Sequence, residues 1–255
     1  MNQKSAEQRR EEILTAIQNE GRVKVTDLSR QYGISEVSIR KDLEILETRG
    51  QLARVHGGAV GVEKTYINMD LNERFKTNSA AKRALAEQVA ELIRDNDTLM
   101  MNAGTTSAYV LRAIKDKKNI SIVTNSIRNA NEAAMYSFNV ILLGGELDYK
   151  YQFTYGQDAE RQLENYHAAK CILSVDGISA EAGLTLFYSN EAALVRKMIE
   201  SSSSVIVAAD GTKVGRSAFA RITDAQKTDI LVTAAIEDRA EIDRLTELGI
   251  RIIES

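Results

Sequence analysis

Residues 33–58 read GISEVSIRKDLEILETRGQLARVHGG, and this stretch decides the fold of the N-terminal part of the chain. A glycine is followed by a helical pattern in which Ile39, Leu43 and Leu46 recur on one face. The stretch ends in an alternating run that turns on two glycines, as a hairpin does. This order predicts the second half of a helix-turn-helix followed by a β-wing, an arrangement that enters the DNA major groove.

The residues before this stretch predict the other helices of the same domain. Residues 6–20 have one apolar face and predict a first helix, closed by Gly21. We expect Thr26 to cap a second helix over residues 27–32. Gly33 then supplies the tight turn, and we expect a serine two residues later to cap the third helix.

The exposed face of the third helix is the predicted DNA-reading surface. A recognition helix presents its N-terminal residues to base edges, so we expect Arg40 or Lys41 to bind a guanine and Val37 to contact a thymine methyl. The wing residues would reach phosphates or the minor groove. The predicted DNA contacts are Ser35, Glu36, Val37, Ser38, Arg40, Lys41, Arg54 and His56. The alternative is that these charges form only a solvated helix face.

The charge balance is weak for a protein that binds DNA. The 255-residue chain has a net charge of −3, and residues 1–60 hold ten Lys and Arg against nine Asp and Glu. Placement of the basic residues on one face, together with a homodimer or homotetramer, would raise the number of phosphate contacts. We therefore expect operator DNA and further copies of the chain as partners.

Other features of the composition limit the possible functions. A single cysteine, Cys171, excludes an intramolecular disulfide, and two distant histidines argue against a zinc centre. No apolar stretch reaches transmembrane length, and no signal-peptide pattern is present. We expect a cytoplasmic protein with no metal, no cofactor, no catalytic residue and no membrane partner.

The N-terminal pattern resembles the DNA-binding domain of DeoR-family bacterial transcriptional repressors. The resemblance covers residues 9–59 and rests on the Ile-Arg-Lys-Asp-Leu helix that begins at Ile39. Leu-Glu, Gly, Leu, Arg and His-Gly-Gly-Ala follow it at the family's spacing. The resemblance implies a winged helix-turn-helix over residues 1–59.

The remainder of the chain predicts a second domain of a different class. Residues 60–78 have little helical or strand period and are interpreted as an interdomain connection. Residues 79–255 alternate helices with apolar strands, the signature of a Rossmann-like parallel α/β sheet. A helix is predicted over residues 81–93. Strands are expected over residues 98–101, 120–123, 140–143, 171–175, 205–209, 230–232 and 250–253.

Small polar residues follow five of these strands and predict a ligand pocket. Ligands of open α/β sheets bind beyond the carboxyl ends of the strands. Gly104-Thr105-Thr106 opens a helix and predicts an anion site, with positive charge from Lys82 and Lys213. The other polar side chains would bind sugar hydroxyls. The predicted effector residues are Lys82, Asn102, Gly104, Thr105, Thr106, Asn125, Ser126, Gly144, Gly145, Asp176, Glu191 and Lys213. Taken singly, each of these motifs is more often an ordinary turn.

Residues 80–255 also resemble the DeoR effector domain. Ala-Gly-Thr-Thr, Thr-Asn-Ser, Leu-Gly-Gly, Val-Asp-Gly-Ile and Ala-Asp-Gly-Thr-Lys occur in the family's order. The resemblance implies a fold similar to ribose-5-phosphate isomerase and a phosphorylated sugar as effector. Three positions depart from the family. Asn102 replaces an aspartate, Gly211-Thr212 replaces Ser-Ser, and residues 186–190 differ from the usual polar run.

Three functions are compared. The preferred hypothesis is a repressor of a carbohydrate-utilisation operon, controlled by the sugar phosphate. The first alternative is a sugar-phosphate isomerase with an accessory DNA-binding domain, in which Asp176 or Glu191 acts as general base and Lys213 stabilises an enediolate. Fold alone does not choose between them, but an enzyme has no evident need of the N-terminal module. The second alternative, a purely structural DNA-bridging protein, leaves the polar strand ends unexplained.

Overall fold

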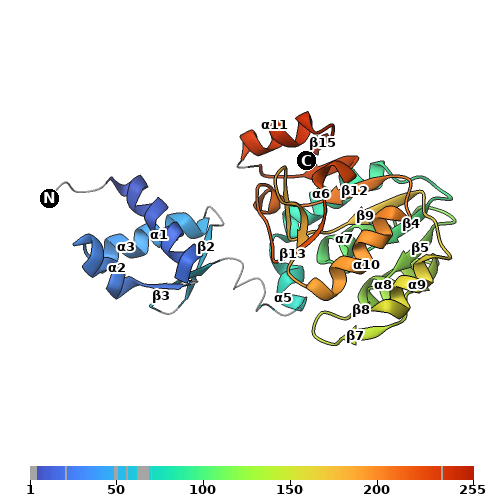
Figure 1. Cartoon of the computed structure of the whole chain (residues 1–255), viewed down its shortest axis with the longest axis horizontal. Coiled ribbons are helices and arrows are strands. Elements are labelled where there is room, and N and C mark those ends of the chain that lie inside the picture. Colours follow the sequence, from blue (N-terminus) through green and yellow to red (C-terminus); the bar gives the residue numbers. More distant parts are fainter. Residues whose placement is uncertain are drawn as a thin grey trace. The chain divides into compact units, whose positions relative to one another are not determined.

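The computed structural model describes residues 5–20, 22–48, 51–55, 57–61, 69, 71–236 and 238–255. The chain forms two compact units, Met1–Met69 and Asp70–Ser255 (Figure 1). The predicted DNA contact His56 lies outside the described residues, as do residues 62–68 and 70 of the predicted interdomain connection.

The N-terminal unit is a winged helix-turn-helix, as predicted. Its three strands form an antiparallel sheet in the order β1-β3-β2. Its elements are α1 (Ala6–Glu20), β1 (Arg22–Lys24), α2 (Val25–Tyr32), α3 (Glu36–Thr48), β2 (Leu52–Val55) and β3 (Gly58–Gly61). Ile39, Leu43 and Leu46 of α3 are buried against α1 and the wing, so the predicted apolar face is confirmed.

The helix ends follow the predicted chemistry with one exception. Gly33 has φ 64° and closes α2, and the Ser35 hydroxyl accepts the Ser38 amide at 3.2 Å at the start of α3. The predicted cap at Thr26 is wrong. The helix α2 begins at Val25, after the extended residue Lys24, and no side chain caps it.

The C-terminal unit is built on a seven-stranded parallel sheet in the order β15-β14-β12-β9-β4-β5-β6. All seven predicted strands are present, with ends within two residues of those predicted. They are β4 (Thr98–Met101), β5 (Ser121–Thr124), β6 (Asn139–Leu142), β9 (Lys170–Leu173), β12 (Val205–Ala208), β14 (Ile230–Thr233) and β15 (Arg251–Glu254).

Helices cover both faces of this sheet. Successive residues of a strand point to opposite sides, and here the residues on both sides are apolar, so both faces must be buried. On β4, Met100 packs in one apolar cluster while Leu99 and Met101 pack in the other. One layer contains α6 (Ser79–Glu91), α7 (Thr105–Ala113) and α8 (Ile127–Met135). The other contains α9 (Gln157–Leu163), α10 (Ser189–Glu200) and α11 (Arg239–Glu247).

Several elements were not predicted from the sequence. Within the stretch interpreted as an irregular connection, residues 71–76 form the helix α5 (Leu71–Lys76), whose Phe75 ring stacks on Tyr109 at 4.6 Å between centroids. The others are short antiparallel strands: β7 (Glu146–Asp148), β8 (Phe153–Tyr155), β10 (Gly177–Ser179), β11 (Gly183–Leu186) and β13 (Ala220–Thr223).

A buried carboxylate joins two helices of the N-terminal unit and generates a stability prediction. Asp42 of α3 accepts Arg9 Nε at 2.7 Å and Arg10 Nε at 3.0 Å from α1. Asp42→Ala should lower the free energy of unfolding of this unit by about 3 kcal/mol, because it removes the buried carboxylate from Arg9 and leaves Arg10 with the exposed Glu7 alone. Urea titration followed by circular dichroism measures the change.

Asp27→Ala is the matched control for this prediction. Asp27 lies 3.9 Å from Arg30 in an exposed pair, which contributes about 0–1 kcal/mol. Equal effects of the two substitutions would contradict the structural role of Asp42.

Candidate DNA-binding surface and effector site

The first turns of α3 carry exposed side chains, as predicted. Val37 is 73% exposed, and Ser38, Arg40 and Lys41 are also exposed. The hydroxyls of Ser35 and Ser38 lie 3.0 Å apart. The buried face of α3 fixes the rotation of the helix, so these side chains project together to the solvent side.

Arg40 is held by an acidic neighbour on the same helix. Its Nη2 donates to Glu36 Oε2 at 2.8 Å, one turn away. Both side chains are well exposed, so the pair contributes only a few tenths of a kcal/mol. The guanidinium group therefore exchanges readily between Glu36 and an external acceptor.

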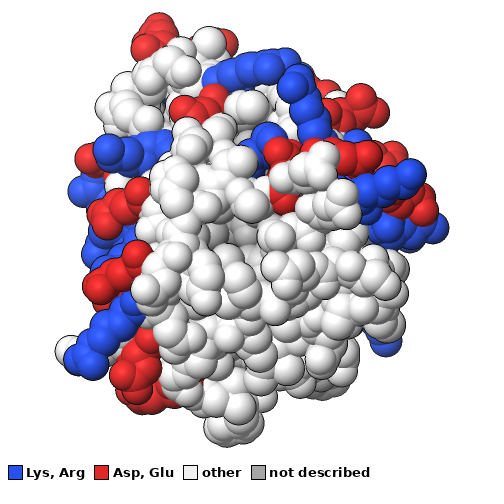
Figure 2. Space-filling model, turned by 90° about the vertical axis from the view of Figure 1, so that its right-hand side faces the viewer, with Lys and Arg blue, Asp and Glu red and all other residues white. Residues whose placement is uncertain are grey.

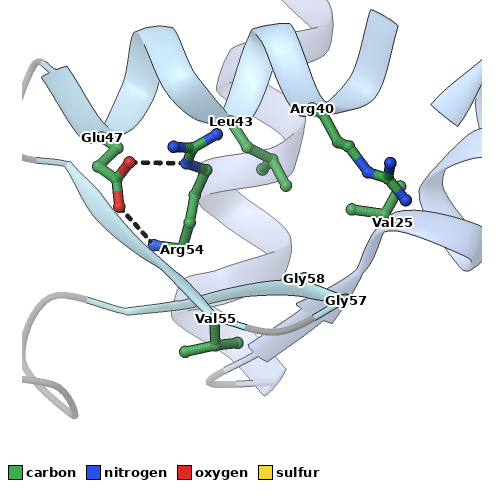
Figure 3. Close-up of a pocket in the computed structure, with 8 residues that line it drawn as sticks. All are labelled: Val25, Arg40, Leu43, Glu47, Arg54, Val55, Gly57 and Gly58. Atoms are coloured by element: carbon green, nitrogen blue, oxygen red, sulfur yellow. Dashed lines mark hydrogen bonds and ion pairs between the residues drawn. The ribbon is translucent and has the colours of Figure 1, made fainter. Parts of the chain in front are cut away.

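A hollow of about 370 Å³ lies between α3 and the wing (Figure 3). Arg40 and Arg54 line it from the helix and the wing, together with Val25, Leu43, Glu47, Val55, Gly57 and Gly58. Arg54 donates to Glu47 through its amide at 2.9 Å and its Nε at 2.6 Å. Partial burial raises the pKa of Glu47, but these hydrogen bonds outweigh it and hold the pKa below its usual value.

In the C-terminal unit, Asn102 joins the ends of two neighbouring strands. Its Nδ2 donates to the Ser174 carbonyl at 3.0 Å, and its Oδ1 accepts the Ser174 amide at 2.9 Å. An aspartate would place a second oxygen against that carbonyl. The amide of Asn102 thus satisfies both backbone groups, which an ionised carboxylate could not do.

Asn125 and Glu191 meet at the same edge of the sheet. The Ala103 amide donates to Asn125 Oδ1 at 2.9 Å and to Glu191 Oε1 at 3.1 Å, and Asn125 Nδ2 donates to the same carboxylate oxygen at 3.1 Å. Burial raises the pKa of Glu191 to about 8, against the opposing effect of these two donors. The carboxyl group is thus largely protonated at neutral pH.

Three cations converge near these strand ends. Burial lowers the pKa of Lys213, although the charges of Asp176 and Asp210 raise it. The charge of Arg74 lowers it further. Burial lowers the pKa of Lys82 to about 8, with Asp210 opposing and Lys213 and Arg74 adding to the shift. Burial is the main cause of both shifts, and Arg74 adds to each of them, so positive charge is concentrated near these strand ends beside Asp176 and Asp210.

Arg74 is the site residue that sequence reasoning missed. Its Nη2 donates to the Tyr188 hydroxyl at 2.8 Å, and its guanidinium carbon lies 4.5 Å from the Tyr151 ring centroid. Lys82 Nζ donates to the carbonyl oxygens of Arg74 at 2.6 Å and Thr77 at 2.7 Å. No sequence signal marked Arg74, because its side chain contacts Tyr151 and Tyr188, which are far from it in the sequence.

The other predicted effector residues have structural contacts of their own. Asp176 accepts the Phe187 amide at 2.9 Å, and Ser126 caps α8 through the Asn129 amide at 3.2 Å. The remaining five fall in two groups. Gly104, Thr105 and Thr106 form the buried start of α7, where a Cβ on Gly104 would collide with the Ser174 side chain. Gly144 and Gly145 instead pack against α9 and β8, through Gln162, Tyr155 and Ala159.

Comparison with known proteins identifies the family. Residues 9–65 match the DeoR-like helix-turn-helix domain, and residues 77–235 match the DeoR C terminal sensor domain. An Escherichia coli protein whose name refers to transcriptional repression of the aga operon is 33% identical over 96% of this chain and 93% of its own. The glycerol-3-phosphate regulon repressor of Escherichia coli is 29% identical over 96% of this chain and 97% of its own.

The chain therefore belongs to the DeoR family of transcriptional regulators. Among solved structures, ribose 5 phosphate isomerase A from Neisseria gonorrhoeae matches 52% of each chain at 19% identity, with a TM-score of 0.40. A likeness this loose supports neither a substrate nor a reaction for this chain. No helix within the described ranges is long and apolar enough to cross a membrane.

The raised pKa of Glu191 generates a prediction about stability and pH. Between its usual pKa near 4.5 and the value of about 8, the folded protein holds a proton that the unfolded chain releases. Stability contributed by this group is therefore lost as pH rises through that window. Glu191→Gln keeps an oxygen that accepts both donors but does not ionise. The variant should lose this fall in melting temperature between pH 5 and 8.

Glu200→Gln, at the exposed far end of the same helix, is the control and should keep the wild-type pH dependence. Identical pH profiles for wild type and Glu191→Gln would show that Glu191 is ionised throughout.

Proposed function

We propose that the protein represses a carbohydrate-utilisation operon by binding its operator, and that a phosphorylated sugar bound in the C-terminal unit controls this binding. The observation that carries the DNA-binding part is geometric. Arg40 of the recognition helix and Arg54 of the wing line one hollow, so a helix in the major groove places both cations beside the DNA.

The carboxylate partners of these arginines suggest how they bind DNA. Each arginine would exchange its glutamate for an acceptor on the DNA. Glu36 and Glu47 hold Arg40 and Arg54 in the free protein. DNA phosphates and guanine edges can accept two hydrogen bonds from one guanidinium group, and phosphate binding brings the favourable release of counterions. Binding therefore replaces two weak surface pairs with contacts to DNA, and the side chains are already oriented.

The chemistry of the strand ends supports an anionic, hydroxylated effector. Lys213 and Arg74 supply positive charge, while the carboxylate of Asp176 offers an acceptor for hydroxyls. One relative's name refers to a glycerol-3-phosphate regulon, and glycerol 3-phosphate is an anionic, hydroxylated compound. The relatives' names as regulators also favour a sensor over the isomerase alternative.

The helix α5 offers a route from the effector to the DNA-binding unit. Its Arg74 side chain belongs to the cationic cluster, and its backbone carbonyl is tied to Lys82. In sequence, α5 is the first helix of the C-terminal unit after the connection to the wing. An anion that draws Arg74 toward Lys213 would shift α5 and so bias the arrangement of the two units.

The DNA-reading role predicts a loss of sequence discrimination in Arg40→Ala. Removal of a bidentate base contact should weaken specific binding by about 1–3 kcal/mol and leave nonspecific binding nearly unchanged. Footprinting upstream of neighbouring sugar-utilisation genes locates the operator, and fluorescence anisotropy against operator and random duplexes measures both affinities. Arg30→Ala, on the exposed side of α2, is the control. An unchanged affinity ratio would reject the base contact, and the absence of any protected region would reject the repressor.

The effector role predicts that Lys213→Ala abolishes ligand stabilisation. A sugar phosphate at 100 times its dissociation constant should stabilise the wild-type protein by about 2.7 kcal/mol. Thermal shift with glucose 6-phosphate, fructose 6-phosphate and glycerol 3-phosphate, each beside its unphosphorylated form, measures this effect. Lys197→Ala, whose lysine pairs with Glu164 at 3.1 Å, should respond as wild type does. A Lys213→Ala protein that still responds fully would place the anion elsewhere.

A further inference from the structure

The strand β6 forms one edge of the C-terminal sheet, and its outer side is open in the described structure. It pairs with β5 only, in a continuous register without a bulge. Asn139 and Leu143 donate their amides toward β5, at 3.0 Å and 2.9 Å. Backbone groups alternate along a strand, so those of Val140 and Leu142 point away from the sheet.

The usual protections of an edge strand are missing here. Exposed edges are normally blunted by charged side chains, proline, bulges or a covering element. Residues 133–145 contain no charged residue and no proline. The opposite edge strand, β15, carries Arg251 and Glu254 at its ends. The contrast between the two edges indicates that the β6 edge is kept free for pairing.

Apolar side chains surround this edge. Leu142 is 43% exposed, and Met135, Leu147 and Tyr149 are 69%, 51% and 87% exposed on the segments just before and after it. Figure 2 looks onto the side of the sheet that lies beyond β5. It shows a broad uncharged face, with Lys, Arg, Asp and Glu gathered at its borders. Exposed apolar surface with a charged rim marks an interaction site.

We propose that a second copy of this chain occupies this face, with the two β6 strands paired antiparallel about Ile141 to form one continuous sheet. A two-fold interface places each patch against itself, so any net charge on it would repel its own copy. Residues 133–145, which include β6, carry no charge, and Glu146, Asp148 and Lys150 follow them on β7 and the turn after it. A two-fold dimer also presents two recognition helices to an operator. Only this last point rests on the proposed function.

In this register, the outward-pointing backbone N–H and C=O groups of Val140 and Leu142 all form hydrogen bonds. Val140 of one copy faces Leu142 of the other, and the two pairs exchange four hydrogen bonds. Ile141 then faces Ile141 of the second copy in a pair without hydrogen bonds, with the two Cα atoms about 4.5 Å apart. The Gly144 amide, further along the strand direction, is already bonded to Gln162 Oε1 at 3.1 Å and limits the register.

Light scattering of the full chain without DNA tests the interface. We expect wild-type protein at micromolar concentration to have the mass of two or more chains. Leu142→Lys should reduce that mass to half or less. The dissociated protein should remain folded, with a melting temperature that can still be measured. Phe219→Lys is the matched control, because Phe219 is 84% exposed on a different segment. A monomeric wild type, or a Leu142→Lys protein with unchanged mass, would overturn the proposal.

A cysteine at the centre of the pair tests the register. Ile141→Cys should form a disulfide-linked dimer under mild oxidation, since the Cα separation lies within the range that a disulfide spans. The chain's own Cys171 is fully buried and burial raises its pKa to about 12, so it does not compete. Phe219→Cys should remain monomeric on a non-reducing gel. Failure of Ile141→Cys to crosslink would overturn the pairing, whether or not the protein binds DNA.

Discussion

The arrangement of the effector site depends on one buried carboxyl group. Glu191 lies at the start of α10, and its Oε1 accepts hydrogen bonds from the end of β4 and from Asn125 at the end of β5. A charged carboxylate at this depth would be costly, so the group keeps its proton and acts as a hydrogen-bonding joint. Asn102 performs the same task between β4 and β9. These joints fix the strand ends, around which the cations then gather.

The two units apply the same physical logic at different depths. At the DNA-binding face, Arg40 and Arg54 are paired with exposed carboxylates, so solvent keeps the pairs weak and exchangeable. In the C-terminal unit, burial is the main cause of the lowered pKa values of Lys82 and Lys213, with Arg74 adding to each shift and nearby carboxylates opposing it. Solvent screens charges less at the buried strand ends than on the surface, so the proposed anion would interact more strongly there.

Sequence reasoning located the strands and the recognition helix because their signals are local. Runs such as Val205–Ala208 and the Ile39, Leu43 and Leu46 period are readable without tertiary information. The helix α5 was missed because six residues are too few to show a period, and its stability comes from Phe75 on Tyr109. The role of Arg74 could not be predicted either, because it depends on tertiary contacts with Tyr151 and Tyr188. The predicted effector residues were chosen as polar groups at strand ends, but several of them, such as Gly144, pack against neighbouring elements.

The central claim is that one molecule couples a phosphorylated sugar to the operator, and operator affinity measured with and without the sugar tests it most directly. Anisotropy titrations of the operator duplex would be run at saturating sugar phosphate and, separately, at the same concentration of the plain sugar. The account predicts a change in operator affinity with the phosphorylated form alone. An operator affinity that stays constant while the sugar phosphate is bound would contradict the coupling.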